Sequence, residues 1–261
     1  MQNNIISGLF VGQNLVILKE VASTNNYLKD LLSNSKPVAD GTVIMAESQF
    51  AGRGQQTNRW HSEAGKNLTF SLLLKPAFLA LQQQFDLTRV ISLGVVTGLQ
   101  QATGLPVQVK WPNDIYYGDK KLGGILIENM VQGSIIKNAV IGIGLNINQE
   151  SFPPEVPNPT SVKQILQKDY DLHALLSQIC GCIEAWYLKL KASRLDEIRE
   201  QYLANLYWLN QEREFLSDKG EKFTGAITAV RNNGFLVLRT KNGEKEFTLK
   251  QIQFLNKPSL L

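Results

Sequence analysis

The hydrophobic pattern of this 261-residue chain changes after Trp208, and that change limits the possible folds more than any other feature. Before Trp208, apolar runs with the length of strands alternate with runs that have helical spacing. Such a pattern predicts a mixed sheet covered by helices. After Trp208, short alternating runs are separated by turn signals, which predicts hairpins in a small barrel. We therefore expect an α+β fold, with one domain over residues 1–208 and a second over 209–261.

The same pattern predicts the individual elements. Strands are expected at 14–21, 42–46, 68–74, 107–110, 113–117, 122–128 and 138–147. Helices are expected from about 27 to 32, at 85–103, near 163, and at 172–190 and 195–207. The Pro-rich stretch 151–162 is expected to be a loop, and tight turns are expected at 218–220, 232–234 and 242–243. Ser23, Thr24 and Asn25 precede the first helix, where such residues are typical N-caps.

Charge and residue counts argue against several kinds of site. The formal net charge is +4 with scattered Lys and Arg, so a nucleic-acid surface is weakly supported and an anionic small molecule fits equally well. Cys180 and Cys182 lie two apart in a helical segment, so they point to different faces and form neither a bridge nor half of a zinc site. His61 and His173 are the only histidines, too few for a histidine metal centre.

The chain shows neither a signal segment nor an apolar run of membrane length, so a cytoplasmic protein is expected. With so few histidines, a Ser-His-Asp triad is also hard to assemble. An enzyme of this composition is expected to act by positioning its substrate and by positive charge.

Three glycine-containing segments carry the chemical information. In the first, "AESQFAGRGQQTNRW" at 46–60, Gly52, Arg53 and Gly54 follow a predicted strand. Glycine permits close backbone approach, so successive N–H groups and the Arg53 guanidinium could meet one anion. A lone motif of this kind is more often a solvated surface loop.

The second segment, "VKWPNDIYYGDKKLGGILIENM" at 109–130, is a predicted hairpin. Lys110 and Lys121 flank it, so both ammonium groups could lie near one strand face. Asp114 could hold a lysine, a metal or an incoming amine, and Gly123-Gly124 leaves room for a ligand on the backbone. The alternative is a solvated turn.

The third segment, "GIGLNIN" at 142–148, ends a predicted strand. Its glycines suit either a bulge or close approach of a ligand. Asn146 could bind an adenine edge or a triphosphate oxygen, or it could be a hydrogen-bonded structural amide.

In their order and spacing, these segments resemble the biotin-protein ligases over nearly the whole chain. The resemblance rests on Ser23-Thr24-Asn25, Gly52-Arg53-Gly54, Lys110-Trp111-Pro112-Asn113-Asp114, Lys121-Leu122-Gly123-Gly124-Ile125-Leu126 and Gly142-Ile143-Gly144-Leu145-Asn146. It implies a catalytic domain like that of class II aminoacyl-tRNA synthetases, followed by an SH3-like barrel.

The resemblance also implies an activity. Biotin would react with ATP to form biotinoyl-AMP and diphosphate, and the acyl group would pass to one lysine of a biotin carboxyl carrier protein domain. Magnesium would arrive mostly through phosphate oxygens and water, so no metal site on the protein is expected. Two alternatives stay open at this point, a lipoate-type ligase and a non-catalytic binding module whose barrel recruits a partner. A homodimer is a further possibility.

Site residues carried over from the resemblance fall into three groups. The implied catalytic residues are Arg53, Lys110, Asp114 and Lys121. The implied substrate-binding residues are Ser23, Thr24, Asn25, Gln49, Gly52, Arg53, Gly54, Gln55, Trp60, Lys121, Gly123 and Gly124. The implied ATP-binding residues are Arg53, Lys110, Asn113, Lys121 and Asn146. Within these groups, Ser23, Thr24 and Gln49 would bind the ureido ring.

The chain departs from the family pattern in two places. Many family members continue the arginine-glycine loop with basic residues, whereas this chain has Gln55, Gln56, Thr57 and Asn58, so a weaker hold on biotinoyl-AMP is expected. Repressor-type members carry a helix-turn-helix domain before the Ser-Thr-Asn segment, but only about twenty residues precede Ser23 here. Direct binding to DNA is therefore not expected.

Overall fold

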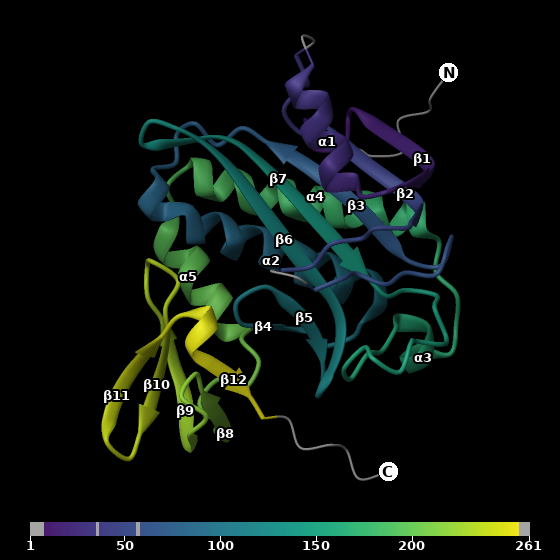
Figure 1. Cartoon of the computed structure of the whole chain (residues 1–261). Helices are drawn as coiled ribbons and strands as arrows, with labels where there is room; N and C mark the ends of the chain where they lie inside the picture. The colour runs from purple at the N-terminus through teal and green to yellow at the C-terminus, as the bar shows by residue number, and fades with distance from the viewer. Residues whose placement is uncertain (1–7, 35–36, 56–57, 256–261) are drawn as a thin grey trace.

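The larger of two sheets contains seven strands. The computed structural model of the protein describes residues 8–34, 37–55 and 58–255. The seven strands are β1 (Leu15–Val21), β2 (Val43–Gln49), β3 (Leu68–Leu74), β4 (Gln108–Lys110), β5 (Asp114–Tyr117), β6 (Lys120–Gln132) and β7 (Ile135–Leu145). Their order is β1-β2-β3-β7-β6-β5-β4 (Figure 1). Strands β1 and β2 are parallel and the other neighbours are antiparallel.

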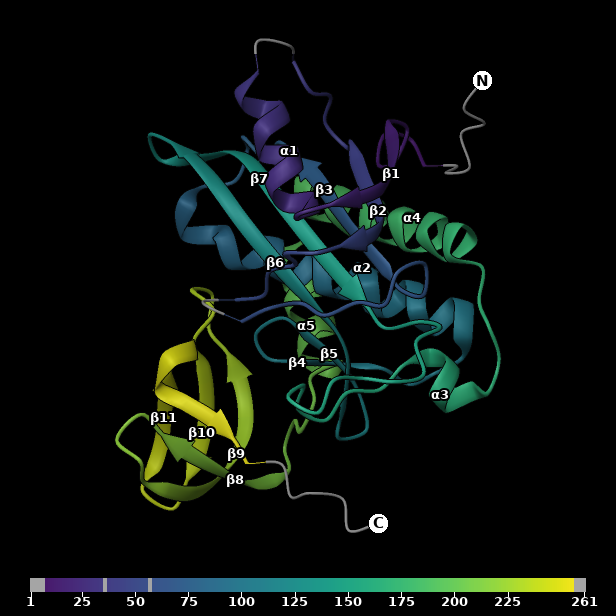
Figure 2. The same cartoon turned by 45° about the vertical axis from the view of Figure 1, so that its right-hand side comes forward.

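Helices cover both faces of this sheet, as Figures 1 and 2 show. They are α1 (Thr24–Ser33), α2 (Gln84–Thr103), α3 (Val162–Leu166), α4 (Leu172–Lys191) and α5 (Leu195–Ala204), with single turns η1 (Leu81–Gln83) and η2 (Leu249–Gln251). Because side chains alternate along a strand, Val43 and Met45 of β2 join the large core that contains α2 and α4. Ile44 packs instead with Leu28 of α1 on the opposite face.

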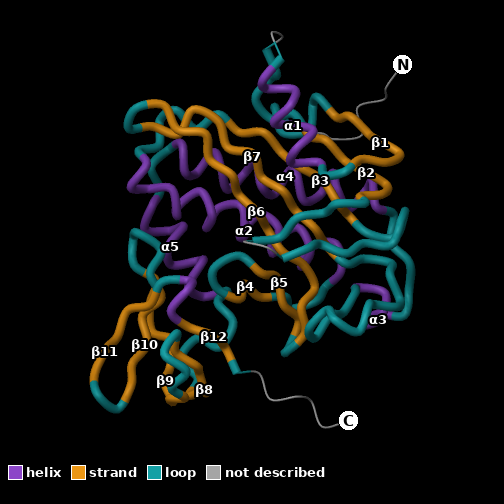
Figure 3. Tube along the Cα trace, viewed as in Figure 1, coloured by secondary structure: helices purple, strands orange, loops and turns teal. Residues whose placement is uncertain are grey.

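The second sheet is antiparallel and lies beyond α5 in the chain. It contains β8 (Glu212–Ser217), β9 (Lys222–Val230), β10 (Leu236–Thr240), β11 (Gly243–Phe247) and β12 (Ile252–Phe254), in the order β11-β10-β9-β8-β12 (Figure 3). The predicted α+β fold is confirmed, with a mixed sheet covered by helices and a small antiparallel unit consistent with an SH3-like barrel. The division into domains at residue 208 stays a prediction.

Several predicted boundaries differ. The first helix begins at Thr24, so Thr24 and Asn25 lie inside it rather than before it. The strand expected at 42–46 extends to Gln49, and the strand expected at 122–128 spans Lys120–Gln132. The expected helix 195–207 ends at Ala204, because the following residues bond to the edge of the large sheet. The Tyr207 N–H donates to the Val109 carbonyl at 2.9 Å, so this segment continues beside β4 rather than as a helix.

Hydrogen bonds join the two sheets. Arg89 of α2 is paired with the buried carboxylate of Asp86 at 2.5 Å, and its second amino group donates to the Val230 and Arg231 carbonyls at 3.2 and 2.6 Å. The indole of Trp111 donates to the Gly234 carbonyl at 2.9 Å. Since buried polar groups need partners, these contacts hold the β9–β10 connection against the large sheet.

Both cysteines are free and buried, as expected from their spacing. No helix within the described ranges has the length and apolar character needed to cross a bilayer.

We expect Gly94→Ala to destabilise the protein, although alanine favours helices. A Cβ on Gly94 would lie 2.6 Å from the Cα of Ile183 on α4. Overpacking of this kind costs about 1–3 kcal/mol, which exceeds the gain in helix propensity of about 1 kcal/mol. The free energy of unfolding, measured by urea titration, tests this.

Gly181→Ala on α4 is the matched control. No atom lies within 4 Å of its added Cβ among the described residues, so the substitution should stabilise by about 0.5–1 kcal/mol. Equal effects of the two substitutions would contradict the close packing of α2 on α4.

Candidate active site

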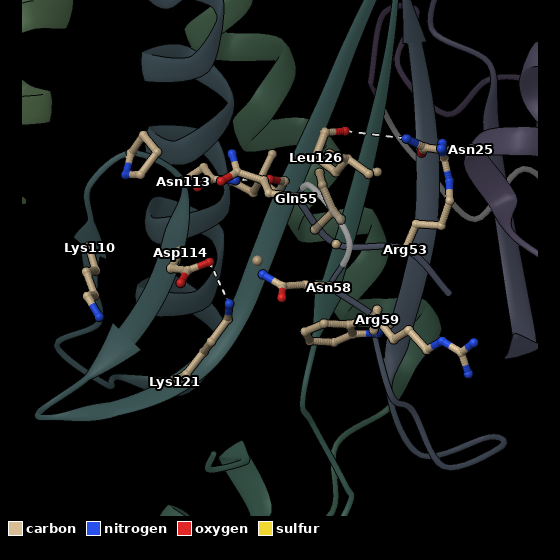
Figure 4. A pocket seen from close by; sticks show the side chains of 18 of the residues that line it. Asn25, Arg53, Gln55, Asn58, Arg59, Lys110, Asn113, Asp114, Lys121 and Leu126 are labelled. Carbon is tan, nitrogen blue, oxygen red and sulfur yellow. Dashed lines mark hydrogen bonds and ion pairs between the residues drawn. The ribbon is translucent and has the colours of Figure 1, made fainter. Parts of the chain in front are cut away.

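A cavity of about 280 Å³ lies on the α1 face of the large sheet. Figure 4 shows the side chains of 18 of the residues that line it and labels ten of them. The predicted site residues that line the cavity are Ser23, Thr24, Asn25, Gln49, Arg53, Gly54, Gln55, Trp60, Lys110, Asn113, Asp114, Lys121 and Gly124. These residues come from segments that lie far apart in the sequence and meet at one cavity.

The floor of the cavity is formed by neighbouring strands whose register brings glycines together. Gly144 of β7 lies between Thr69 of β3 and Gly124 of β6, and Gly124 in turn pairs with Asp114 of β5. Since residues paired across strands point to the same face, two missing side chains in one row leave a hollow in the sheet.

The side chains of Trp60 and Asn25 pack closely against glycines of β7. A Cβ on Gly144 would collide with the indole of Trp60, and a Cβ on Gly142 would lie 2.5 Å from Oδ1 of Asn25. The two glycines of the third segment are therefore required by close packing of Trp60 and Asn25 against β7.

At one end of the cavity, Lys121 Nζ pairs with Asp114 Oδ1 at 2.7 Å, and both side chains are about 30% exposed. A register shift between Ile115 and Tyr116 places Lys121 opposite Tyr116. Tyr116 and Asp114 are two residues apart and share a face, so the bulge directs Lys121 to the cavity side. In Figure 4, the Asp114 carboxylate faces the ammonium group of Lys121.

Lys110 lies at the same end, on β4 opposite Asp114. Its Nζ donates to the Tyr116 hydroxyl at 3.1 Å and lies 4.6 and 5.0 Å from the ring centroids of Tyr116 and Phe254. Burial lowers the pKa of Lys110 to about 8, although Asp114 favours its charged form, and Lys121 lowers the pKa further. Lys110 is thus a cation whose charge is lost slightly above neutral pH.

The other end carries uncharged polar groups. Ser23 has the N-cap position of α1, but its side chain makes no capping hydrogen bond. The Thr24 N–H donates to Gln49 Oε1 at 2.6 Å, which leaves the Gln49 amino group without a partner among the described residues. Ser23 and Thr24 are each only 3% exposed. These groups can offer both donors and acceptors to a ligand.

Arg53 lines the cavity, but its guanidinium turns toward Asn25 rather than toward Lys121 (Figure 4). It pairs with Glu128 Oε2 at 2.5 Å, while Lys29 binds the other oxygen at 2.9 Å. Burial alone would raise the pKa of Glu128, but hydrogen bonds from Lys29, Arg53 and Asn25 outweigh burial and lower it. Glu128 is therefore an anion that holds Arg53 in the ligand-free protein.

Three predicted site residues do not line the cavity. A Cβ on Gly52 would lie 2.5 Å from the Trp60 carbonyl, and one on Gly123 would lie 2.6 Å from the Gly144 carbonyl, so both glycines permit close packing. Asn146 donates to the Thr160 carbonyl at 3.0 Å and is 4% exposed. Its amino group therefore has a structural contact, whereas its buried Oδ1 has no hydrogen-bond partner among the described residues.

Asn113 does line the cavity, but its side-chain amide is engaged. Its Nδ2 donates to the Ile125 main-chain carbonyl, and the Ile125 N–H donates to the main-chain carbonyl of Asn113 at 3.0 Å. Asn113 therefore fixes the position of the Lys110–Asp114 segment against β6.

Several lining residues were not predicted. Turn η2 supplies Leu249, and strand β12 of the second sheet supplies Ile252, Gln253 and Phe254. No motif marks them, because apolar residues of a barrel strand have the same pattern whether or not they meet a cavity. Ser71 and Glu128 were also missed, since each contacts a lining residue without lining the cavity itself.

The neutral loop of the first segment is only partly described. Gln55, Asn58 and Arg59 line the cavity, and the Arg59 guanidinium points outward in Figure 4. Gln56 and Thr57 lie outside the described residues. The weaker hold on an acyl-adenylate stays a prediction.

Known proteins match this chain closely. Residues 17–146 match the model of the biotin/lipoate A/B protein ligase family. The bifunctional ligase/repressor BirA of Bacillus spizizenii is 30% identical over 246 residues, which cover 93% of this chain and 74% of that protein. The biotin–[acetyl-CoA-carboxylase] ligase of Mycobacterium tuberculosis is 31% identical over 227 residues, 85% of this chain and 82% of that protein.

A solved structure agrees over nearly all of the chain. The biotin protein ligase from Aquifex aeolicus, in complex with biotin and ATP, has a TM-score of 0.78 and 30% identity, covering 94% of this chain and 99% of that one. Fold, sequence and the order of the motifs point to one conclusion. The chain belongs to the biotin protein ligases of the biotin/lipoate A/B protein ligase family.

Proposed function

We propose that this protein attaches biotin to a lysine of a carrier protein, with ATP as the energy source and biotinoyl-AMP as the intermediate. The observation that carries the proposal is the composition of one cavity. Uncharged donors and acceptors gather near Ser23, Thr24 and Gln49, while the cations Lys110 and Lys121 lie at the other end. A ligand with a neutral polar head and a carboxylate tail suits that arrangement.

The polar end favours biotin over lipoate. A ureido ring has N–H donors and a carbonyl acceptor, so it can use the Thr24 hydroxyl and the Gln49 amino group, which has no partner among the described residues. The dithiolane ring of lipoate offers neither, so the Gln49 amino group and the lone pairs of Thr24 that face the cavity would gain no partner. Loss of such partners costs about 1–3 kcal/mol for each group.

At the cationic end, two anions must meet in the first step, the biotin carboxylate and the α-phosphate of ATP. Lys121, held by Asp114, and Lys110 would offset their repulsion. Each charge-assisted hydrogen bond contributes about 1.5–3 kcal/mol, whereas holding two reactants in line lowers the barrier by about 7–11 kcal/mol. Positioning by the cavity is therefore expected to outweigh any single contact.

Arg53 could bind a phosphate only if its ion pair with Glu128 is broken. To reach a phosphate it would have to exchange Glu128 for the ligand, since the two are paired at 2.5 Å. The Arg53 side chain is about 40% exposed, so solvent and a ligand can reach it.

In the second step, a neutral lysine amine attacks the acyl carbon and AMP leaves. Asp114 lies next to Lys121 in the cavity and is the group we propose to orient the amine. The nearby cations would favour its deprotonated form, because like charges disfavour an ammonium group.

Partners and location complete the proposal. The described residues hold no group of three His, Cys, Asp or Glu that could bind a metal. We expect magnesium to be held mostly by the phosphates of ATP and by water, and Asp114 is a carboxylate that lines the same cavity. A biotin carboxyl carrier protein domain would supply the lysine. A cytoplasmic location and a homodimer stay predictions.

Exchange of labelled diphosphate into ATP should depend on biotin. With ATP and magnesium, biotin is expected to drive exchange and lipoate is not. Lys121→Ala should reduce the rate by about 10²–10³-fold, because a preorganised cation at the reacting phosphate is lost. Lys163→Ala, which removes a lysine paired with Asp169 outside the cavity, is the control. Exchange driven by lipoate, or by neither acid, would refute the proposal.

Asp114→Ala should slow acyl transfer to the carrier more than adenylate formation. The substitution removes the carboxylate that orients the incoming amine, whereas Lys121 keeps its charge for adenylate formation, and the expected loss in transfer is about 10²–10⁴-fold. Single-turnover transfer from preformed biotinoyl-AMP, compared with diphosphate exchange, separates the steps. Asp169→Ala, at an exposed Asp–Lys pair, is the matched control. Equal losses in both steps would argue that Asp114 only holds Lys121.

The apparent KM for ATP should rise with pH through the pKa of Lys110. Its ammonium is present below about pH 8 and is lost as pH rises above that value. Between pH 7 and pH 9 the charged fraction falls about tenfold, and KM should rise in proportion. Lys110→Arg keeps the charge and should flatten the profile. A wild-type KM that does not change over this range would exclude Lys110 from phosphate binding.

A further inference from the structure

A continuous chain of hydrogen bonds runs beneath the cavity from Arg53 to Thr24. Arg53 and Asn25 both donate to Glu128 Oε2, at 2.5 and 2.8 Å. Ser71 Oγ lies 2.6 Å from Asn25 Oδ1 and 2.7 Å from Thr24 Oγ1. Two members, Ser71 and Glu128, do not line the cavity, yet they connect three residues that do.

The donor and the acceptor in each of these hydrogen bonds follow from the number of protons that each side chain carries. Glu128 as a carboxylate can only accept, so the Asn25 amino group must face it and Oδ1 must face Ser71. Asn25 Oδ1 can also only accept, so Ser71 gives it the single hydroxyl proton it has. Ser71 Oγ is then an acceptor for Thr24, and Thr24 must donate to it.

This order determines what Thr24 can offer a ligand. Its proton is used inside the protein, so its hydroxyl presents only lone pairs to the cavity. Water cannot easily replace a member of the chain, because Ser71 is fully buried and Thr24 and Asn25 are each 3% exposed. The chain is anchored at its far end by Lys29, which binds the second Glu128 oxygen at 2.9 Å.

We propose that Ser71 and Glu128 are positioning residues that make Thr24 a hydrogen-bond acceptor and thereby select a ligand with an N–H at that point. The inference rests on the proposed function, in which the N–H belongs to the ureido ring of biotin. Specificity is thus set partly by two residues that the ligand does not touch.

Ser71→Ala tests the buried half of the chain. Without Ser71, the Thr24 proton is free to turn toward the ligand, and the N–H of biotin then meets a donor. The KM for biotin in diphosphate exchange should rise about five- to tenfold, while kcat and the KM for ATP change less than about twofold. Ser92→Ala is the matched control, because Ser92 is fully buried and its hydroxyl has no partner among the described residues.

Analogues of biotin give a readout that a structural role would not change. In the two oxazolidinone analogues, one ring oxygen replaces one N–H of the ureido ring. Wild type should discriminate strongly against the analogue whose oxygen faces Thr24. Ser71→Ala should reduce that discrimination about tenfold, because the freed Thr24 proton can donate to the ring oxygen.

Glu128→Gln tests the other end of the series of hydrogen bonds. The Glu128 side chain is 27% exposed, so this substitution leaves the core intact. A glutamine can also donate, so it no longer fixes the Asn25 amide, and the KM for biotin should again rise. Because both substitutions interrupt the same series of hydrogen bonds, their effects should be less than additive in the double variant.

The outcomes separate the two proposals. Exchange by wild type that does not depend on biotin would refute the proposed function. Biotin-dependent exchange in which Ser71→Ala behaves as Ser92→Ala, or in which Ser71→Ala and Glu128→Gln add fully, would overturn the positioning role alone. If Ser71→Ala does not fold, Glu128→Gln with the analogues decides: unchanged discrimination overturns the inference.

Discussion

The register of β3, β7, β6 and β5 is the constraint on which the rest of the site depends. Pairing of Thr69, Gly144, Gly124 and Asp114 in one row puts two glycines side by side on the α1 face. A shift of one residue in any pair would turn these positions to the other face and fill the hollow with side chains. The cavity and the close packing of Trp60 and Asn25 against β7 all follow from this register.

The two ends of the cavity differ because different parts of the fold supply them. The start of α1 brings uncharged groups with fixed hydrogen-bond directions, whereas the β5–β6 hairpin brings Lys121, turned to the cavity by a bulge. The second sheet belongs to the site as well, since Phe254 lies against Lys110 and the Trp111 indole is bonded to Gly234. If catalysis depends on the positions of charged groups, contacts that fix those groups are required.

Much of the fold could be predicted because periodicity is a local property. The strand 68–74 was predicted with its observed bounds, since seven consecutive buried residues leave little choice of structure. The helix after Leu195 was predicted three residues too long, because its end is decided by a contact with Val109 far away in sequence. The roles of Gly123 and Asn146 could not be separated from ligand binding for the same reason, as packing glycines and structural amides look alike in a sequence.

The sequence by itself determined the kinds of groups available, their order along the chain and the family they resemble. Its two histidines made a histidine metal centre or a Ser-His-Asp triad hard to assemble, so positioning and positive charge were the expected means of catalysis. Only the tertiary structure decided that Arg53 faces Glu128, that Lys110 is desolvated between two rings, and that Ser71 lies 2.7 Å from the Thr24 hydroxyl. Composition and spacing specify local conformation, whereas side-chain direction and the sharing of protons depend on neighbours brought together across the sheet.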